Sequence, residues 1–189
     1  MLCAPSGVMA RQTPHSAQAS SASSSQPRKW SEVDEKALLA KAQREDAGAQ
    51  FWLGTGYEQG WFGKPDFQKA LKWLRRAAKH RNPDAEACLG QMYEDGEGAP
   101  QNYVLAAKWY RKAAEHVPDL GGAGQGRNHL GLLYMDGLGV PKDYVQAYMW
   151  FSLANVEANL ASVKAQMTPA QVLEAERMAA EWKSRHPER

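Results

Sequence analysis

One eight-residue pattern occurs three times along this chain and limits what it can fold into more than any other feature. The segments LGTGYEQG, LGQMYEDG and LGLLYMDG occupy residues 53–60, 89–96 and 130–137. They share the frame Leu-Gly-x-x-Tyr-x-x-Gly, and the copies are 36 and 41 residues apart. Self-similarity at such a period is typical of repeat architectures, in which each copy is one unit stacked on its neighbours.

The similarity continues downstream of each copy. A Trp follows each repeated Leu at the same distance, at Trp73, Trp109 and Trp150, with an Ala before and after it in every unit. The five extra residues of the longer spacing fall in the glycine-rich segment 118–126. Because large aromatic side chains need partners that bury them, these Trp positions are predicted to lie in the core.

Each unit is predicted to contain two helices. The repeated Leu, Gly and Tyr lie on one face of a first helix, and Asp66, Asn102 and Asp143 are N-cap residues that predict the start of a second. The glycines between the helices, such as Gly137 and Gly139, are predicted to take positive φ angles. A glycine-rich turn can also bind phosphate, but a P-loop follows a strand and ends in GK[ST], and DGLGVPKD does neither. We therefore interpret this turn as a connection between helices.

Further helices are predicted on both sides of the repeats. Residues 31–46 form one helix, with Ser31 as its cap, and residues 155–166 form another that does not follow the repeat pattern. In residues 168–182, Thr168, Pro169 and Gln171 stand at the N-cap, N1 and N3 positions of a last helix. Terminal units of a repeat array differ from the others because one of their faces meets water.

The first 29 residues differ in composition from the rest. Residues 11–29 are rich in Ser, Gln and Ala, and such a segment is predicted to be a disordered linker. Val8 and Ala10 stand at the −3 and −1 positions of a possible signal cleavage site, although a basic n-region is missing. The segment is either the remnant of a signal peptide or an N-terminus without that meaning. We expect an exported protein, periplasmic or secreted, with a cytoplasmic location as the alternative.

The motifs LGxxYxxGxGV and D-x-x-x-A-x-x-W, with a closing pair of alanines, resemble the Sel1-like repeat family, a relative of tetratricopeptide repeats. DGEGAPQNYVLAAKWYRKAAEH, at residues 95–116, is the unit with the strongest resemblance. The resemblance implies an all-α, right-handed α/α solenoid over residues 30–183. Its units would span about 46–81, 82–117 and 118–155, and capping helices would span 156–183.

The resemblance also implies a function. Bacterial Sel1-like proteins are mostly non-enzymatic adaptors that bind a peptide or protein, so we expect that role here. Some cysteine-rich relatives are associated with β-lactam binding and hydrolysis, but they carry a cysteine pair in each repeat where this chain has Ala114 and Glu86. That activity and a cytoplasmic regulatory role remain the alternatives.

Composition favours none of the other common function classes. The formal net charge of +2 requires neither nucleic acid nor a membrane as partner, and no stretch approaches the roughly 20 apolar residues of a membrane span. Two cysteines, Cys3 and Cys88, are too few for a disulfide framework or a zinc site. His129, Cys88 and Trp52 occupy equivalent repeat positions, which indicates a packing position rather than a catalytic one. No catalytic, cofactor-binding or metal-ligating residue is predicted.

Two surfaces remain as candidates for binding. The run from Lys69 to Arg81 has six basic residues and no acidic one, so it is either a solvated helix face or a patch for anionic partners. The other candidate is the concave face, which the first helices line in such solenoids. The residues expected to face a peptide with basic and apolar side chains are Phe51, Thr55, Glu58, Ala87, Gln91, Glu94, Asn128, Leu132 and Met135.

Overall fold

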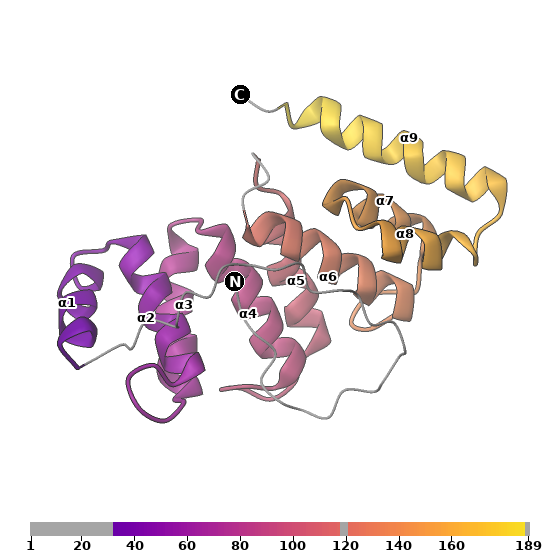
Figure 1. The fold of residues 1–189 in the computed structure, drawn as a ribbon. Helices are drawn as coiled ribbons and strands as arrows, with labels where there is room; N and C mark the ends of the chain where they lie inside the picture. The colour runs from indigo at the N-terminus through magenta and orange to yellow at the C-terminus, as the bar shows by residue number, and fades with distance from the viewer. Residues whose placement is uncertain (1–31, 118–120, 188–189) are drawn as a thin grey trace, which may run out of the picture.

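The computed structural model describes residues 32–117 and 121–187, and all regular secondary structure there is helical (Figure 1). Three helix pairs follow one another: α2 (Ala47–Gln59) with α3 (Phe67–Lys79), α4 (Pro83–Asp95) with α5 (Tyr103–Ala114), and α6 (Gly122–Asp136) with α7 (Tyr144–Ala154). At one end α1 (Glu32–Ala42) packs on α2, and at the other α8 (Glu157–Lys164) and α9 (Pro169–Arg185) pack on α7. The predicted α/α solenoid of three helix-turn-helix units with additional terminal helices is confirmed. The predicted linker, residues 1–29, lies outside the described residues.

The second helix of each pair begins at its predicted cap. The side chains of Asp66, Asn102 and Asp143 accept hydrogen bonds from backbone N–H groups two or three residues later, at 2.9–3.0 Å. The backbone N–H groups of the same three residues donate to the carbonyl of the repeated Tyr, at 2.7–2.9 Å. Each turn is therefore closed by the same two interactions, which explains why the spacing from Tyr to cap does not vary.

Glycines end the first helices and let neighbouring units meet. Gly60, Gly96 and Gly137 are C-caps with φ angles of 70°, 78° and 75°, which confirms the predicted positive φ. A Cβ placed on Gly139 would lie 2.2 Å from the carbonyl carbon of Tyr103, so this turn rests against the start of the preceding second helix. No residue other than glycine fits there without a backbone shift.

The repeated glycine inside each first helix permits close packing within the pair. A Cβ on Gly54, Gly90 or Gly131 would come within 2.5–2.6 Å of a side chain on the second helix of the same unit. The side chains that it would meet are Leu74, Tyr110 and Phe151, which occupy equivalent positions one residue after the repeated Trp. The Trp itself is buried at Trp73 and Trp150, as predicted, but half-buried at Trp109.

Tyrosine hydroxyls link consecutive units. The repeated Tyr93 and Tyr134 each accept a hydrogen bond from an arginine of the preceding second helix, Arg75 and Arg111 respectively. The second of these bonds measures 2.6 Å. In the first unit the hydroxyl of Tyr57 donates instead to Glu35 of α1, at 2.5 Å. The repeated Tyr of each unit thus forms a polar contact with the helix or unit before it.

One buried polar position holds a different residue, with different hydrogen-bond partners, in each unit. Gln50, Glu86 and Arg127 are equivalent in the repeat, and all three are buried. The amide of Gln50 donates to the carbonyl of Ala42, and the guanidinium of Arg127 donates to the carbonyls of Ala114, His116 and Leu153 at 2.9–3.3 Å. Both side chains therefore satisfy carbonyls at the ends of neighbouring helices.

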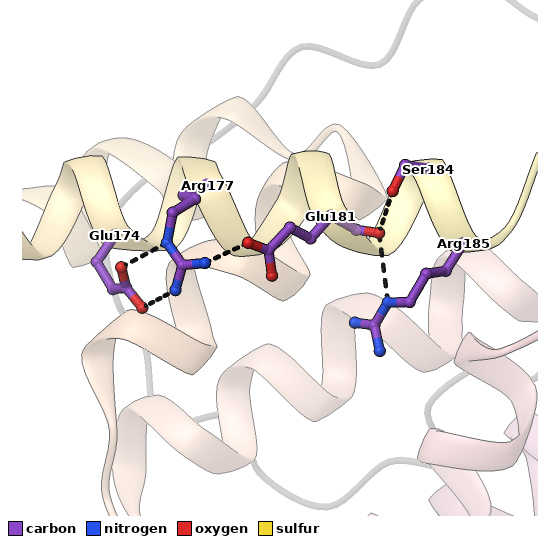
Figure 2. A network of polar contacts seen from close by, with 5 residues as sticks. All are labelled: Glu174, Arg177, Glu181, Ser184 and Arg185. Atoms are coloured by element: carbon purple, nitrogen blue, oxygen red, sulfur yellow. Dashed lines mark hydrogen bonds and ion pairs between the residues drawn. The ribbon is translucent and has the colours of Figure 1, made fainter.

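The last helix begins as predicted and is stabilised on its exposed side. Thr168 and Gln171 form a capping box with Pro169 at the first position. Figure 2 shows the guanidinium of Arg177 bonded to Glu174 one turn before it and to Glu181 one turn after it. On its inner side, Trp182 lies 6.3 Å from Trp150, ring centroid to ring centroid, and so closes the end of the core.

Candidate partner-binding face

The first helices α2, α4 and α6 succeed one another along the solenoid and touch, α2 with α4 and α4 with α6 (Figure 1). The nine predicted site residues occupy equivalent positions on these helices. Four of them, Glu94, Asn128, Leu132 and Met135, are half-buried and accessible, and the amide of Asn159 on α8 donates to Asn128 at 2.7 Å. The other five are buried: Phe51, Thr55, Glu58, Ala87 and Gln91.

Burial of those five corrects the expectation that they face open solvent. First helices of consecutive units lie in contact, so a side chain directed toward the next unit is covered by it. Glu58 is one example. It lies close enough to Asp95, at the end of α4, and to Glu97, in the turn after α4, for their negative charges to raise its pKa. That this face binds a partner stays a prediction.

A group of carboxylates gathers where α2 meets the end of α4. It consists of Glu58, Glu94, Asp95 and Glu97. Glu58 is only 2% exposed, and its Oε2 atom has no hydrogen-bond partner. Burial raises the pKa of Glu58 to about 7, and the negative charges of Glu97 and Asp95 add to the shift. Burial and the charge of Glu94 likewise raise the pKa of Asp95. The face therefore favours a positive charge beside it.

Glu94 is held in a defined position by aromatic neighbours. It accepts a hydrogen bond of 2.6 Å from the hydroxyl of Tyr110, and Nδ1 of His129 lies 3.3 Å from the same oxygen. The ring of His129 stacks on that of Tyr110, with centroids 4.8 Å apart. Burial would raise the pKa of Glu94, but the contacts with His129 and Tyr110 outweigh it, so the pKa is lowered. Glu94 therefore stays ionised on the face.

Aromatic rings gather on the first unit, beside α2. Trp52 is 45% exposed, and its ring centroid lies 5.2 Å from that of Phe51 and 6.0 Å from that of Trp61. Trp61 and Phe62, in the turn after α2, are half-buried, and Phe62 packs on Gly56 and Tyr57.

Sequence reasoning missed Trp52, because its repeat mates Cys88 and His129 indicated a packing position. Cys88 is indeed fully buried and His129 half-buried, so the position is exposed only in the first unit, where the described residues include α1 but no complete helix pair ahead of α2. The candidate site consists of Trp52, Trp61, Glu58, Glu94 and Asp95, with His129 beside Glu94. We call it the acidic–aromatic face.

A family comparison identifies the architecture. The family model described as Sel1 repeat matches residues 47–82, 83–116 and 125–155, each covering one of the three helix pairs. The chain belongs to the Sel1 repeat family. Sel1 repeat proteins typically serve as scaffolds for protein–protein interactions. No curated protein matches the chain.

Two solved Sel1 repeat structures are similar to this chain. One is c5321, a protective antigen present in uropathogenic Escherichia coli strains, which displays an SLR fold, with 31% identity and a TM-score of 0.73. The other is a Sel1 repeat protein from Oxalobacter formigenes, with 30% identity and a TM-score of 0.62. The matches cover 81% and 79% of this chain, but 33% and 62% of the two relatives. This chain therefore spans about a third of the first relative and less than two thirds of the second.

The positions that carry the cysteine pair in β-lactam-associated Sel1 relatives form polar contacts here. The Glu86 carboxylate lies 2.8 Å from Nε2 of His116 and joins α4 to the end of α5, while the carbonyl of Ala114 accepts from Arg127. Cys88 is fully buried, so it presents no sulfur atom to a substrate at the surface. Within the described residues, no group of three or more His, Cys, Asp or Glu side chains could hold a metal ion. None of the helices described is long and apolar enough to cross a membrane.

Proposed function

We propose that this Sel1 repeat chain is a non-enzymatic adaptor that binds a peptide or protein segment with cationic and apolar side chains on its acidic–aromatic face. The observation that carries the proposal is Glu58, a buried carboxylate whose Oε2 has no partner and which lies beside Asp95 and Glu97. A buried carboxylate without a counter-charge is unfavourable, so a cation arriving at this face gains more than it would at an ordinary surface.

The neighbouring rings suit the same ligand. The ring of Trp52 on the first unit is exposed, and a cation over an indole face is attracted to it, so a segment that extends from the carboxylates along the first unit would meet this ring. Trp52 and Trp61, 6.0 Å apart, also offer apolar surface to an aliphatic side chain of the ligand. Aromatic anchors next to charged groups are typical of the residues that dominate binding energy.

The first test uses the full chain and two fluorescent model peptides, one built of Arg, Lys and Leu and the other with Glu in place of the basic residues. We expect the basic peptide to bind and the acidic one not to bind. Asp95→Asn and Trp52→Ala should each weaken binding about five- to tenfold. Glu115→Gln, which removes one exposed charge at the end of α5, is the control and should bind as the parent does.

A second readout is the pH dependence of binding. A cation prefers ionised Glu58, whose pKa is about 7, so affinity should increase as the pH rises from 6 to 8. Glu58→Gln should remove that dependence. Equal affinity for both peptides, or a loss in Glu115→Gln as large as in Asp95→Asn, would refute the proposal.

We also propose that the protein is exported to the periplasm or secreted by a bacterium. The proposal is supported by Val8 and Ala10 at the spacing of a signal cleavage site, ahead of a segment rich in Ser, Ala and Gln. An alkaline phosphatase fusion made with the natural upstream reading frame tests it. Phosphatase activity in intact cells is expected, and its absence would indicate the cytoplasmic alternative.

A further inference from the structure

The second helices of the first two units carry positive charge without any acidic residue. α3 and α5 together contain eight Lys and Arg residues and no Asp or Glu. The whole chain has a formal net charge of only +2, so this excess of positive charge is local. Solubility alone requires charged residues, and mixed signs would serve it equally well.

The basic residues repeat with the period of the fold. Three positions are basic on both helices, 36 residues apart: Lys72 with Lys108, Arg75 with Arg111, and Arg76 with Lys112. The side chains of Lys72, Lys79, Lys108 and Lys112 are exposed, and none of them forms an ion pair with a described residue. Arg75 and Arg111 donate to neutral Tyr hydroxyls, which leave their charges uncompensated. The result is two rows of cations on adjacent units.

The third unit indicates that the basic residues occur only where the second helix is exposed. The equivalent positions on α7 are Met149, Ser152 and Leu153, of which Met149 and Leu153 are buried. α9 packs on α7 and covers this side of the third unit (Figure 1). The cationic rows therefore occupy the two second helices that α9 leaves uncovered.

Two exposed aliphatic side chains lie at one end of the α5 row. Val104 is 51% exposed, and it precedes Lys108 by one helical turn and Lys112 by two, so the three share a face. Leu138 is 37% exposed and stands next to Gly139, whose Cβ position is 2.6 Å from the backbone nitrogen of Val104. The cationic surface thus includes a small apolar edge.

We propose that the surface formed by α3 and α5 binds the face of an anionic phospholipid bilayer. The Lys and Arg side chains would meet the headgroup phosphates, and Val104 and Leu138 would enter the boundary with the acyl chains. This surface belongs to the second helices, whereas the acidic–aromatic face belongs to the first helices, so one chain could hold a partner at a membrane. The inference does not depend on the peptide proposal.

A dissolved polyanion fits the surface less well. Recognition of single-stranded nucleic acid relies on aromatic platforms, but Trp73 is buried and Trp109 is half-buried beneath Lys112, whose Nζ lies 4.3 Å from the ring centroid. Exposed aliphatic side chains gain nothing from a phosphate backbone, whereas a bilayer offers them an apolar interior.

The test is co-sedimentation of the full chain with phosphatidylcholine vesicles that contain or lack phosphatidylglycerol. We expect binding to the anionic vesicles alone, and a decrease in binding at high salt. The double variant Lys72→Gln/Lys108→Gln should lower the partition coefficient about 30-fold, from the usual attraction of each Lys near an anionic membrane. The matched control, Lys164→Gln/Lys183→Gln, removes two exposed charges from α8 and α9 and should bind as the parent does.

A second variant separates a bilayer from a polyanion. Val104→Ser/Leu138→Ser changes only exposed side chains, and it should weaken binding to anionic vesicles while leaving any binding to heparin unchanged. Equal binding to both kinds of vesicle would overturn the proposal, as would equal losses in the two Lys double variants. Binding that survives in the aliphatic variant, together with tight binding to heparin or duplex DNA, would assign the surface to a soluble polyanion instead. Asp95→Asn should bind vesicles normally, which keeps this test distinct from that of the peptide site.

Discussion

Replacement of Gly131 by alanine tests whether the repeated glycine exists for packing between the two helices of a unit. A Cβ at this position would lie 2.6 and 2.7 Å from two ring atoms of Phe151, where ordinary contact begins at 3.4 Å. Phe151 is fully buried, so its ring cannot move into solvent. Overpacking of this kind costs about 1–3 kcal/mol, and the better helix propensity of alanine returns about 1 kcal/mol. Because the contact is far shorter than 3.4 Å and the ring cannot move away, the upper half of that range applies, and we expect a net loss of about 1–2 kcal/mol.

The assay is thermal and urea unfolding followed by circular dichroism. A loss of this size lowers the melting temperature by about 2–8 °C in a protein of this length. Phe151→Leu should relieve the clash, so the double variant Gly131→Ala/Phe151→Leu should lose less stability than the sum of the two single changes. Gly48→Ala, whose Cβ would meet only the Asp46 carboxylate at 3.3 Å, is the control and should be near neutral. A Gly131→Ala variant as stable as the parent would refute the packing argument.

Three further outcomes are expected. Burial raises the pKa of Glu58 to about 7 from an ordinary 4.5, so its ionisation destabilises the fold as the pH rises through that interval. Glu58→Gln should remove this decrease in the free energy of unfolding and add up to about 3 kcal/mol at pH 8. Urea unfolding at a series of pH values measures it. Asp143→Ala should lower the free energy of unfolding by about 1–2 kcal/mol, because two backbone N–H groups lose their acceptor. Asp136 caps no helix, so Asp136→Ala is the control and should cost little. Equal losses in the two variants would contradict the capping role. Arg127→Met should cost about 3 kcal/mol, because three carbonyls at helix ends lose a charged donor, and a stability change below about 1 kcal/mol would show that water replaces it.

Much of the architecture could be predicted because the same short-range interactions recur in all three units. Asp66, Asn102 and Asp143 cap second helices wherever they occur, since a cap depends only on the next three residues. Gly60, Gly96 and Gly137 end first helices for an equally local reason, their freedom to take positive φ. Repetition then revealed which positions pack, and Gly131 could be assigned to a helix interior rather than to a phosphate-binding turn.

The candidate site was less predictable, because exposure depends on what lies beside a helix. The nine predicted residues were chosen by their direction on an isolated helix, and contact between consecutive first helices buries Phe51, Thr55, Glu58, Ala87 and Gln91. Trp52 was overlooked for the converse reason. Its repeat mates Cys88 and His129 have a neighbouring unit to cover them, and Trp52 stands in the first unit.

The sequence by itself determined the number of units, the starts of their second helices and the family, because these follow from short-range patterns that recur at a fixed period. Only the tertiary structure decided which polar groups are buried together. At the equivalent positions Gln50, Glu86 and Arg127, three different side chains meet three different sets of partners, and no periodicity could indicate which. The same holds for Glu58, whose unusual pKa arises from burial and from Asp95 and Glu97, more than 30 residues away in the chain. Burial and charge act through space, so they are fixed only when the units stack.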